Sequence, residues 1–123
     1  MQGSLRFRCE LEKPSDALAV LVLEGDVDIY TAPEFKETLE RALAGGASRI
    51  IVDMARVSFI DSTTLGVLVS GVRQVGERGG ALAVVCSNEH ITRLFEITGL
   101  DHTFAVRATR EEAIRSLTEQ APA

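Results

Sequence analysis

The sequence predicts a single α/β domain, with a mostly parallel mixed β-sheet of about five strands and about four helices packed on it. Two strand-like segments come first and are joined by only a short turn. From there, helix-like and strand-like segments alternate to the end of the chain, which is the pattern of βαβ units. The length of 123 residues fits one domain over residues 1–123. In such sheets, functional loops tend to follow the carboxyl ends of the strands.

The first two strands are predicted from two different patterns. Residues 5–11 alternate apolar and charged side chains, which is typical of a strand exposed on one face. Residues 17–25 begin with a continuous apolar run, which is typical of a strand covered on both faces. Because the turn between them, EKPSD, is short, we expect these two strands to be antiparallel.

The first helix is expected in the segment TAPEFKETLERALAGG. Thr31 followed by Glu34 predicts a capping box at its start, and the paired glycines end it. A buried strand, RIIVDM, is expected at residues 49–54. The next helix should run from about Ser62 to about Arg78 and pack through one apolar stripe. The stripe residues are Leu65, Leu68, Val69, Val72 and Val75.

Two further strands are expected at residues 81–86 and 103–106, with a short helix between them that Ser87 or Asn88 can cap. The segment TREEAIRSL predicts a last helix that begins with a second capping box. Glycine lowers helix stability by up to about 1 kcal/mol relative to alanine. The glycines within the helix that starts near residue 62 therefore predict close approach of another element or of a partner. They are Gly66, Gly71 and Gly76.

The composition argues against several functional classes. A net charge of −5, 5% aromatic residues and the absence of Trp disfavour nucleic-acid binding, which needs basic stripes and stacking side chains. No apolar run approaches the roughly 18 residues of a membrane helix, and the N-terminus lacks a signal-peptide pattern. We therefore expect a cytoplasmic protein without a membrane partner. Cys9 and Cys86 lie far apart in sequence, in two separate predicted strands, so we expect two free thiols in a reducing compartment. The cysteines and histidines lack metal-ligand spacing, and we expect no metal site and no cofactor.

The segment VSFIDSTTLGVLVSGVR places Asp61 and three hydroxyl side chains at the start of a helix. In one interpretation Ser62 is the N-cap and Asp61 interacts with the positive end of the helix dipole. In the other, Ser62 is a phosphorylation site, because a phosphate adds about −1.5 to −2 charges and the free N–H groups of a helix end can hold an anion. The residues alone leave both interpretations open.

An enzymatic alternative starts from the D-x-D pair Asp26 and Asp28, which follows an apolar strand. This pattern resembles the nucleophile motif of haloacid-dehalogenase-type phosphatases, in which Asp26 would attack phosphate and Asp28 would act as acid/base with Mg²⁺. The chain is short for that fold and has no evident late acidic pair for the metal. The sequence shows no nearby base and no G-x-S-x-G motif that would make Ser62 a catalytic nucleophile.

Three segments, in this order, resemble the STAS domain of bacterial anti-sigma factor antagonists: GDVDIYTA, FIDSTTLGVL and RLFEITGL. The resemblance covers roughly residues 5–117. It implies a binding switch in transcription regulation and stress response, and a protein that is not an enzyme and has no catalytic residues. In that family the unphosphorylated antagonist binds an anti-sigma factor that is also a serine kinase, a GHKL-type ATPase, and the sigma factor is released. The kinase phosphorylates the antagonist and ends the complex, and a PPM-type serine phosphatase reverses the modification.

Carried over by position, the resemblance makes Ser62 the phosphorylated residue and Thr63 a second, weaker candidate. Asp26 takes the place of the glutamate in the family's G-E-L-D segment, and Asp28 corresponds to its aspartate. The family usually reads D-S-[ST]-G-L-G, and Thr64 stands where the first glycine does. We expect Thr64 to add bulk and a third hydroxyl where the kinase approaches. The expected partner-binding residues are Asp26, Asp28, Asp61, Ser62, Thr63, Thr64 and Gly66.

STAS modules also occur in stress-sensing assemblies, in lipid-transport complexes and as the tails of anion transporters. The resemblance therefore leaves open a stand-alone STAS subunit of another complex.

Overall fold

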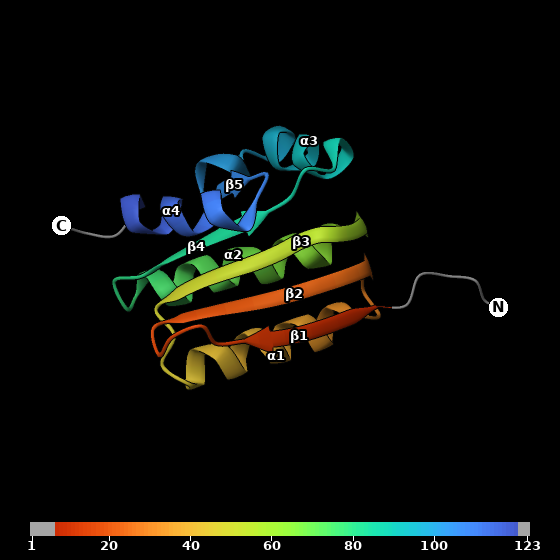
Figure 1. The fold of residues 1–123 in the computed structure, drawn as a ribbon. Helices are drawn as coiled ribbons and strands as arrows, with labels where there is room; N and C mark the ends of the chain where they lie inside the picture. The colour runs from red at the N-terminus through yellow and green to blue at the C-terminus, as the bar shows by residue number, and fades with distance from the viewer. Residues whose placement is uncertain (1–6, 121–123) are drawn as a thin grey trace.

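Strands and helices alternate along residues 7–120, the part of the chain that the computed structural model describes (Figure 1). The elements are β1 (Arg8–Glu12), β2 (Leu18–Val27), α1 (Ala32–Ala44), β3 (Arg49–Ile60), α2 (Ser62–Gly76), β4 (Ala81–Val85), α3 (Glu89–Thr98), the 3-10 turn η1 (Leu100–His102), β5 (Ala105–Arg107) and α4 (Arg110–Gln120). The strands form one sheet in the order β1-β2-β3-β4-β5. Only the β1–β2 pair is antiparallel. The predicted fold class and the antiparallel first pair are confirmed, and the predicted start of the first strand lies outside the described residues.

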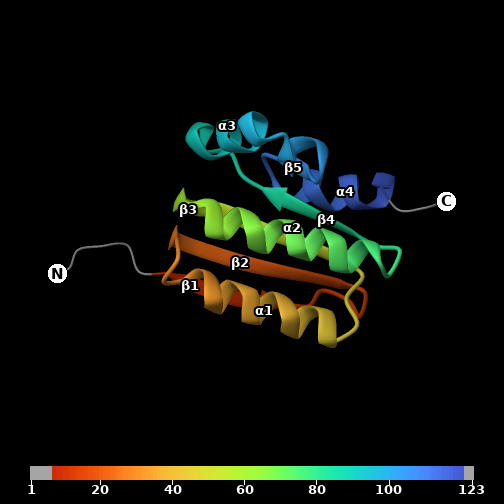
Figure 2. The same ribbon diagram turned by 180° about the vertical axis from the view of Figure 1, so that it is seen from behind.

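Helices cover both faces of the sheet. Helices α1 and α2 lie side by side on one face, and α4 lies on the other (Figures 1 and 2). The larger apolar core lies under α1 and α2 and includes the fully buried Phe35, Leu39 and Leu68. A smaller core joins Ile51 to Leu117 of α4. Burial of these two cores is the main force that holds the layers together.

The third strand continues beyond its predicted end at residue 54. β3 runs to Ile60, because its last residues pair with the end of β2, where Asp26 lies opposite Phe59. Two register shifts interrupt this pairing, and such irregularities disturb the alternation of inward and outward side chains. The pattern ARVSF therefore does not look like a strand in the sequence. Asp61 and the three hydroxyl residues after it therefore follow directly from the end of β3, and not from a long loop.

Helix α2 packs through a stripe that differs from the predicted one. Its buried residues are Thr64, Leu68, Gly71 and Val75. Val69 is 38% exposed, so its assignment to the core was wrong. A Cβ atom on Gly71 would come within 2.9 Å of the Leu39 side chain, which confirms that this glycine permits close packing. Gly66 and Gly76 face open space.

The later helices begin as the sequence predicts. The side chain of Asn88 accepts hydrogen bonds from the N–H groups of His90 and Ile91 at the start of α3. The Thr109 hydroxyl accepts the N–H of Glu112 at 3.2 Å at the start of α4. Next to it, Arg110 binds Asp53 of β3 at 2.9 Å and Glu12 of β1 at 3.0 Å, so α4 is also tied to the sheet by charge.

Candidate functional site

Two segments predicted to form one surface meet at the same end of the sheet. The last residues of β2 and β3 are neighbours, with Val27 opposite Ile60. The chain leaves β2 into α1 and leaves β3 into α2, and both helices start at this edge (Figure 2). The GDVDIYT loop and the Ser62 turn are therefore adjacent, as expected for the carboxyl ends of parallel strands.

Asp61 is the N-cap of α2. Its Oδ1 atom accepts the N–H groups of Thr63 at 3.0 Å and Thr64 at 3.2 Å, and its backbone carbonyl accepts the N–H of Leu65. The prediction that Ser62 caps the helix is wrong, because the extended backbone at Asp61 already places a carboxylate over the first turn. Asp61 thereby occupies the N–H groups of Thr63 and Thr64, two of the first-turn groups that were expected to be free for a phosphate.

Ser62 and Thr63 present their side chains to solvent. Both are exposed residues of the first helical turn. Neither hydroxyl forms a hydrogen bond with any residue that the structure describes. An exposed hydroxyl that forms no hydrogen bond with the described residues is accessible to a modifying enzyme. Thr63 and Gly66 also line a hollow of about 260 Å³ between α1 and α2, together with Lys36.

Thr64 points the other way and is completely buried. Its Oγ1 donates a hydrogen bond of 2.7 Å to the carbonyl oxygen of Val27, at the end of β2. Oγ1 also lies 3.4 Å from Oδ1 of Asp61. Thr64 therefore adds neither bulk nor a hydroxyl to the surface. The prediction that the Thr64 side chain contacts a partner is wrong, because Thr64 lies on the buried face of α2.

Asp28 organises the β2–α1 loop. Its Oδ1 accepts the N–H groups of Tyr30 at 3.0 Å and Thr31 at 3.2 Å. The Thr31 hydroxyl accepts the N–H of Asp28 and donates to the carbonyl of Asp26. Thr31 precedes α1 but makes no side-chain cap bond, so the predicted capping box with Glu34 is wrong. The Thr31 hydroxyl is instead bonded to the backbone of Asp26 and Asp28, and the Asp28 carboxylate forms an Asx turn through the N–H of Tyr30.

The comparisons with known proteins show the family of this chain. A model of the STAS domain matches residues 8–113. This chain belongs to the STAS domain family. The STAS domain is 34% identical over 101 residues to the anti-sigma-B factor antagonist of Listeria monocytogenes, a match that covers 82% of this chain and 88% of that protein. The resemblance seen in the three sequence segments is thereby confirmed.

Solved structures of anti-sigma factor antagonists share the fold of this STAS domain. The antagonist from Mycobacterium paratuberculosis superposes with a TM-score of 0.79 at 25% identity, over 94% of this chain and 95% of that one. The antagonist SpoIIAA is similar in fold at 24% identity in both of its forms. The unphosphorylated form has a TM-score of 0.78, over 91% of this chain and 97% of its own. The phosphorylated form from Bacillus has a TM-score of 0.70, over 89% and 98%.

Apolar side chains that sequence reasoning missed surround the Ser62 turn of the STAS domain. Ile29 is 61% exposed and Tyr30 is 88% exposed in the β2–α1 loop. Phe59, two residues before Asp61, is 51% exposed. Exposed apolar and aromatic residues of this size often mark interaction sites when they gather in one region. The available signal was the pair IY between the polar residues of the GDVDIYT loop.

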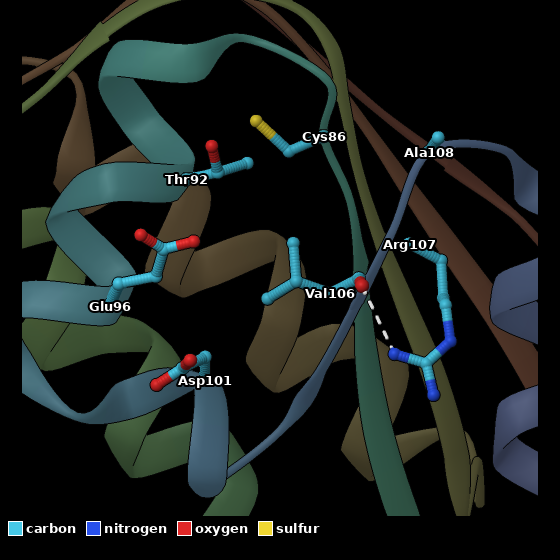
Figure 3. A pocket seen from close by; sticks show the side chains of 7 residues that line it. All are labelled: Cys86, Thr92, Glu96, Asp101, Val106, Arg107 and Ala108. Atoms are coloured by element: carbon cyan, nitrogen blue, oxygen red, sulfur yellow. Dashed lines mark hydrogen bonds between the residues drawn. The ribbon is translucent and has the colours of Figure 1, made fainter.

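A second hollow lies away from this surface, between α3 and β5 (Figure 3). It measures about 330 Å³. Its lining residues are Cys86, Thr92, Glu96, Asp101, Val106, Arg107 and Ala108. Arg107 donates to the carbonyl of Val106 at 3.1 Å and is turned away from Glu96 and Asp101 (Figure 3). Burial raises the pKa of the Cys86 thiol, so this sulfur is a poor nucleophile near neutral pH.

Two further properties of the described residues bear on the alternatives. No helix among residues 7–120 is long and apolar enough to cross a membrane. The same residues contain no cluster of three or more His, Cys, Asp or Glu side chains that could hold a metal ion. Asp28, the acid/base in the phosphatase alternative, instead holds the turn of its own loop.

Proposed function

We propose that this STAS domain is an anti-sigma factor antagonist that works as a partner switch in the cytoplasm. In its unphosphorylated form it binds an anti-sigma factor that is also a GHKL-type serine kinase, and the sigma factor is released. Phosphorylation of Ser62 ends the complex, and a PPM-type serine phosphatase restores it. The observation that carries the proposal is the exposed, uncommitted hydroxyl of Ser62, next to a loop of exposed apolar residues at the same edge of the sheet.

The proposed partner surface consists of the β2–α1 loop, the end of β3 and the first turns of α2. Tyr30, Ile29 and Phe59 supply apolar area, and aromatic anchors carry much of the binding energy in protein interfaces. Asp26 contributes a half-buried carboxylate at the end of β2, which can pair with a basic side chain of the kinase. Gly66 is exposed, with open space where a side chain would stand, so a partner can approach the backbone of α2.

The position of Asp61 explains how phosphorylation would switch binding off. A phosphate on Ser62 brings about −1.5 to −2 charges next to the Asp61 carboxylate, which accepts the N–H groups of Thr63 and Thr64. Because Ser62 is exposed, the new charge lies on the surface beside this carboxylate. Like-charge repulsion and desolvation then oppose the complex. A loss of about 1.4 kcal/mol reduces affinity tenfold, so a change of a few kcal/mol is sufficient for a switch.

Ser62 is proposed over Thr63 because it directly follows Asp61, as in the family motif. Thr63 remains the second candidate, since it is exposed on the same turn. A phosphate on Thr63 would face the hollow that contains Lys36. That cation would partly neutralise the phosphate, and the charge available to repel a partner would be smaller than at Ser62.

Phosphorylation mapped by intact mass tests this proposal. The full chain is incubated with ATP and candidate anti-sigma factor kinases from the same genome, as wild type, Ser62→Ala and Thr63→Ala. We expect one phosphate on the wild type and on Thr63→Ala, and none on Ser62→Ala. Addition of phosphate to Ser62→Ala, or no addition with any kinase that binds the chain, would refute Ser62 as the switch.

A further inference from the structure

Within the proposed partner surface, a buried hydrogen bond connects the first turn of α2 to the end of β2. Thr64 belongs to the first turn of α2, and Val27 is the last residue of β2. They are 37 residues apart in sequence, yet Oγ1 of Thr64 and the carbonyl oxygen of Val27 are 2.7 Å apart. Thr64 has no exposed surface, so water cannot replace this bond. A buried carbonyl without a partner is costly, and the bond therefore fixes the loop to the helix.

Two oxygen atoms lie within reach of the Thr64 hydroxyl as hydrogen-bond acceptors. It carries one proton, which the short contact assigns to the carbonyl of Val27. The second acceptor, Oδ1 of Asp61, is 3.4 Å from the same oxygen and also caps the helix through two N–H groups. A movement of the Asp61 carboxylate therefore alters the surroundings of the Thr64 hydroxyl directly. Asp61 is in turn the immediate neighbour of Ser62.

We propose that Thr64 is a positioning residue that couples the Ser62 turn to the β2–α1 loop, so that a negative charge placed on Ser62 changes the loop that carries Ile29 and Tyr30. The charge repels the Asp61 carboxylate, and the disturbed cap changes the bond from Thr64 to Val27. Val27 leads directly into Asp28, which holds the turn at Tyr30. Phosphorylation would thus alter the apolar half of the surface as well as its charge.

This inference rests on the proposed partner surface, but its test requires no kinase. The variant Ser62→Asp introduces the charge directly, and ¹H–¹⁵N NMR of the full chain reports each backbone amide. We expect Ser62→Asp to shift the amide signals of Asp28 and Tyr30 in the wild-type background. Tyr30 is the single tyrosine of the chain, which contains no Trp, so its ring signals and fluorescence give a second readout of the loop.

The role of the hydroxyl is isolated by variants at residue 64 and a matched control. Thr64→Val keeps the shape of the side chain but cannot donate, and the loop shifts caused by Ser62→Asp should be lost. Thr64→Ser keeps the donor and should restore them. Thr63→Val, on the adjacent exposed position, should leave the shifts unchanged. Loop shifts of equal size in Thr64→Val, or shifts lost equally in Thr63→Val, would overturn the proposal.

The hydroxyl proton of Thr64 provides a test that does not depend on the folding of Thr64→Val. A fully buried hydroxyl in a 2.7 Å hydrogen bond should exchange slowly with water and give its own signal at low temperature. Ser62→Asp should shift that signal. An unchanged signal would overturn the coupling while leaving the phosphorylation of Ser62, and the proposed function, intact.

Discussion

At the scale of single residues, neighbouring side chains at the start of α2 have three different roles. Asp61 caps the helix, Ser62 stays free at the surface and Thr64 is bonded inward to Val27. These tasks follow from the direction of each side chain on a turn of 3.6 residues. A run of one acid and three hydroxyls does not reveal which residue has which task, because each of the four side chains can accept a hydrogen bond from a helix N–H group.

Replacing the capping carboxylate should weaken the helix. Asp61→Ala removes the acceptor for the N–H groups of Thr63 and Thr64, and we expect a loss of about 1 kcal/mol in the free energy of unfolding. Urea denaturation measures the change. Asp61→Asn keeps a capping oxygen and should recover most of the loss. Equal stability of Asp61→Ala and wild type would contradict the assignment of the cap.

Removing the buried donor should cost more than removing an exposed one. Thr64→Val leaves the carbonyl of Val27 without its partner, and we expect a loss of about 1–3 kcal/mol in the free energy of unfolding. Thr63→Val changes an exposed residue and should stay within about 0.5 kcal/mol of wild type. Urea titrations of both variants provide the comparison, and a larger loss in Thr63→Val would reverse the orientation of the turn.

At the scale of elements, the existence and order of the helices and strands could be predicted from the sequence, and their ends only in part. The start of α3 was predicted with Ser87 or Asn88 as its cap, and the structure shows that Asn88 caps the helix. The capping box predicted at Thr31 does not form, because the backbone groups of Asp26 and Asp28 take up the Thr31 hydroxyl. The end of β3 was missed, because the register shifts beside β2 remove the alternation on which strand prediction depends.

Glycines at the two ends of the α2–β4 connection should respond oppositely to alanine. A Cβ on Gly80 would overlap the carbonyl oxygen of Ser48, whereas one on Gly76 would meet open space. We expect Gly80→Ala to lower the free energy of unfolding by roughly 1–3 kcal/mol or more, because the backbone must move. Gly76→Ala should raise it by up to about 1 kcal/mol. Thermal unfolding of the two variants measures both changes. A Gly80→Ala variant as stable as wild type would contradict the close approach of Gly80 to Ser48.

At the scale of the whole molecule, the alternation of elements was sufficient to predict the fold, since it allows few topologies. The surface was harder to predict. Asp26, Asp28 and Ser62 were selected from the sequence, but Ile29, Tyr30 and Phe59 were not. Apolar residues are normally assigned to a core, and only the structure shows that the loop held by Asp28 turns two of them outward.

The two thiols make the stability of the folded chain depend on pH. Burial raises the pKa of Cys9 and of Cys86, so the folded state holds these protons more tightly than the unfolded state. The stabilisation is complete below the pKa of an unfolded thiol, about 8.5, and declines as the pH rises above it. Urea denaturation between about pH 7 and about pH 10 should show this decline. A double variant with Cys9→Ala and Cys86→Ala should lose less stability over this pH range. An equal loss in the variant and the wild type would show that other groups cause the pH dependence.

The central claim is that this STAS domain binds an anti-sigma factor through the surface around Ser62 and releases it on phosphorylation. The most direct test is the dissociation constant of the complex with the cognate anti-sigma factor kinase, measured by calorimetry for the unmodified chain and for the chain phosphorylated on Ser62. We predict measurable binding of the unmodified chain and at least about tenfold weaker binding of the phosphorylated chain, a difference of about 1.4 kcal/mol or more. Equal affinity of the two forms, or binding of the phosphorylated form alone, would contradict the account.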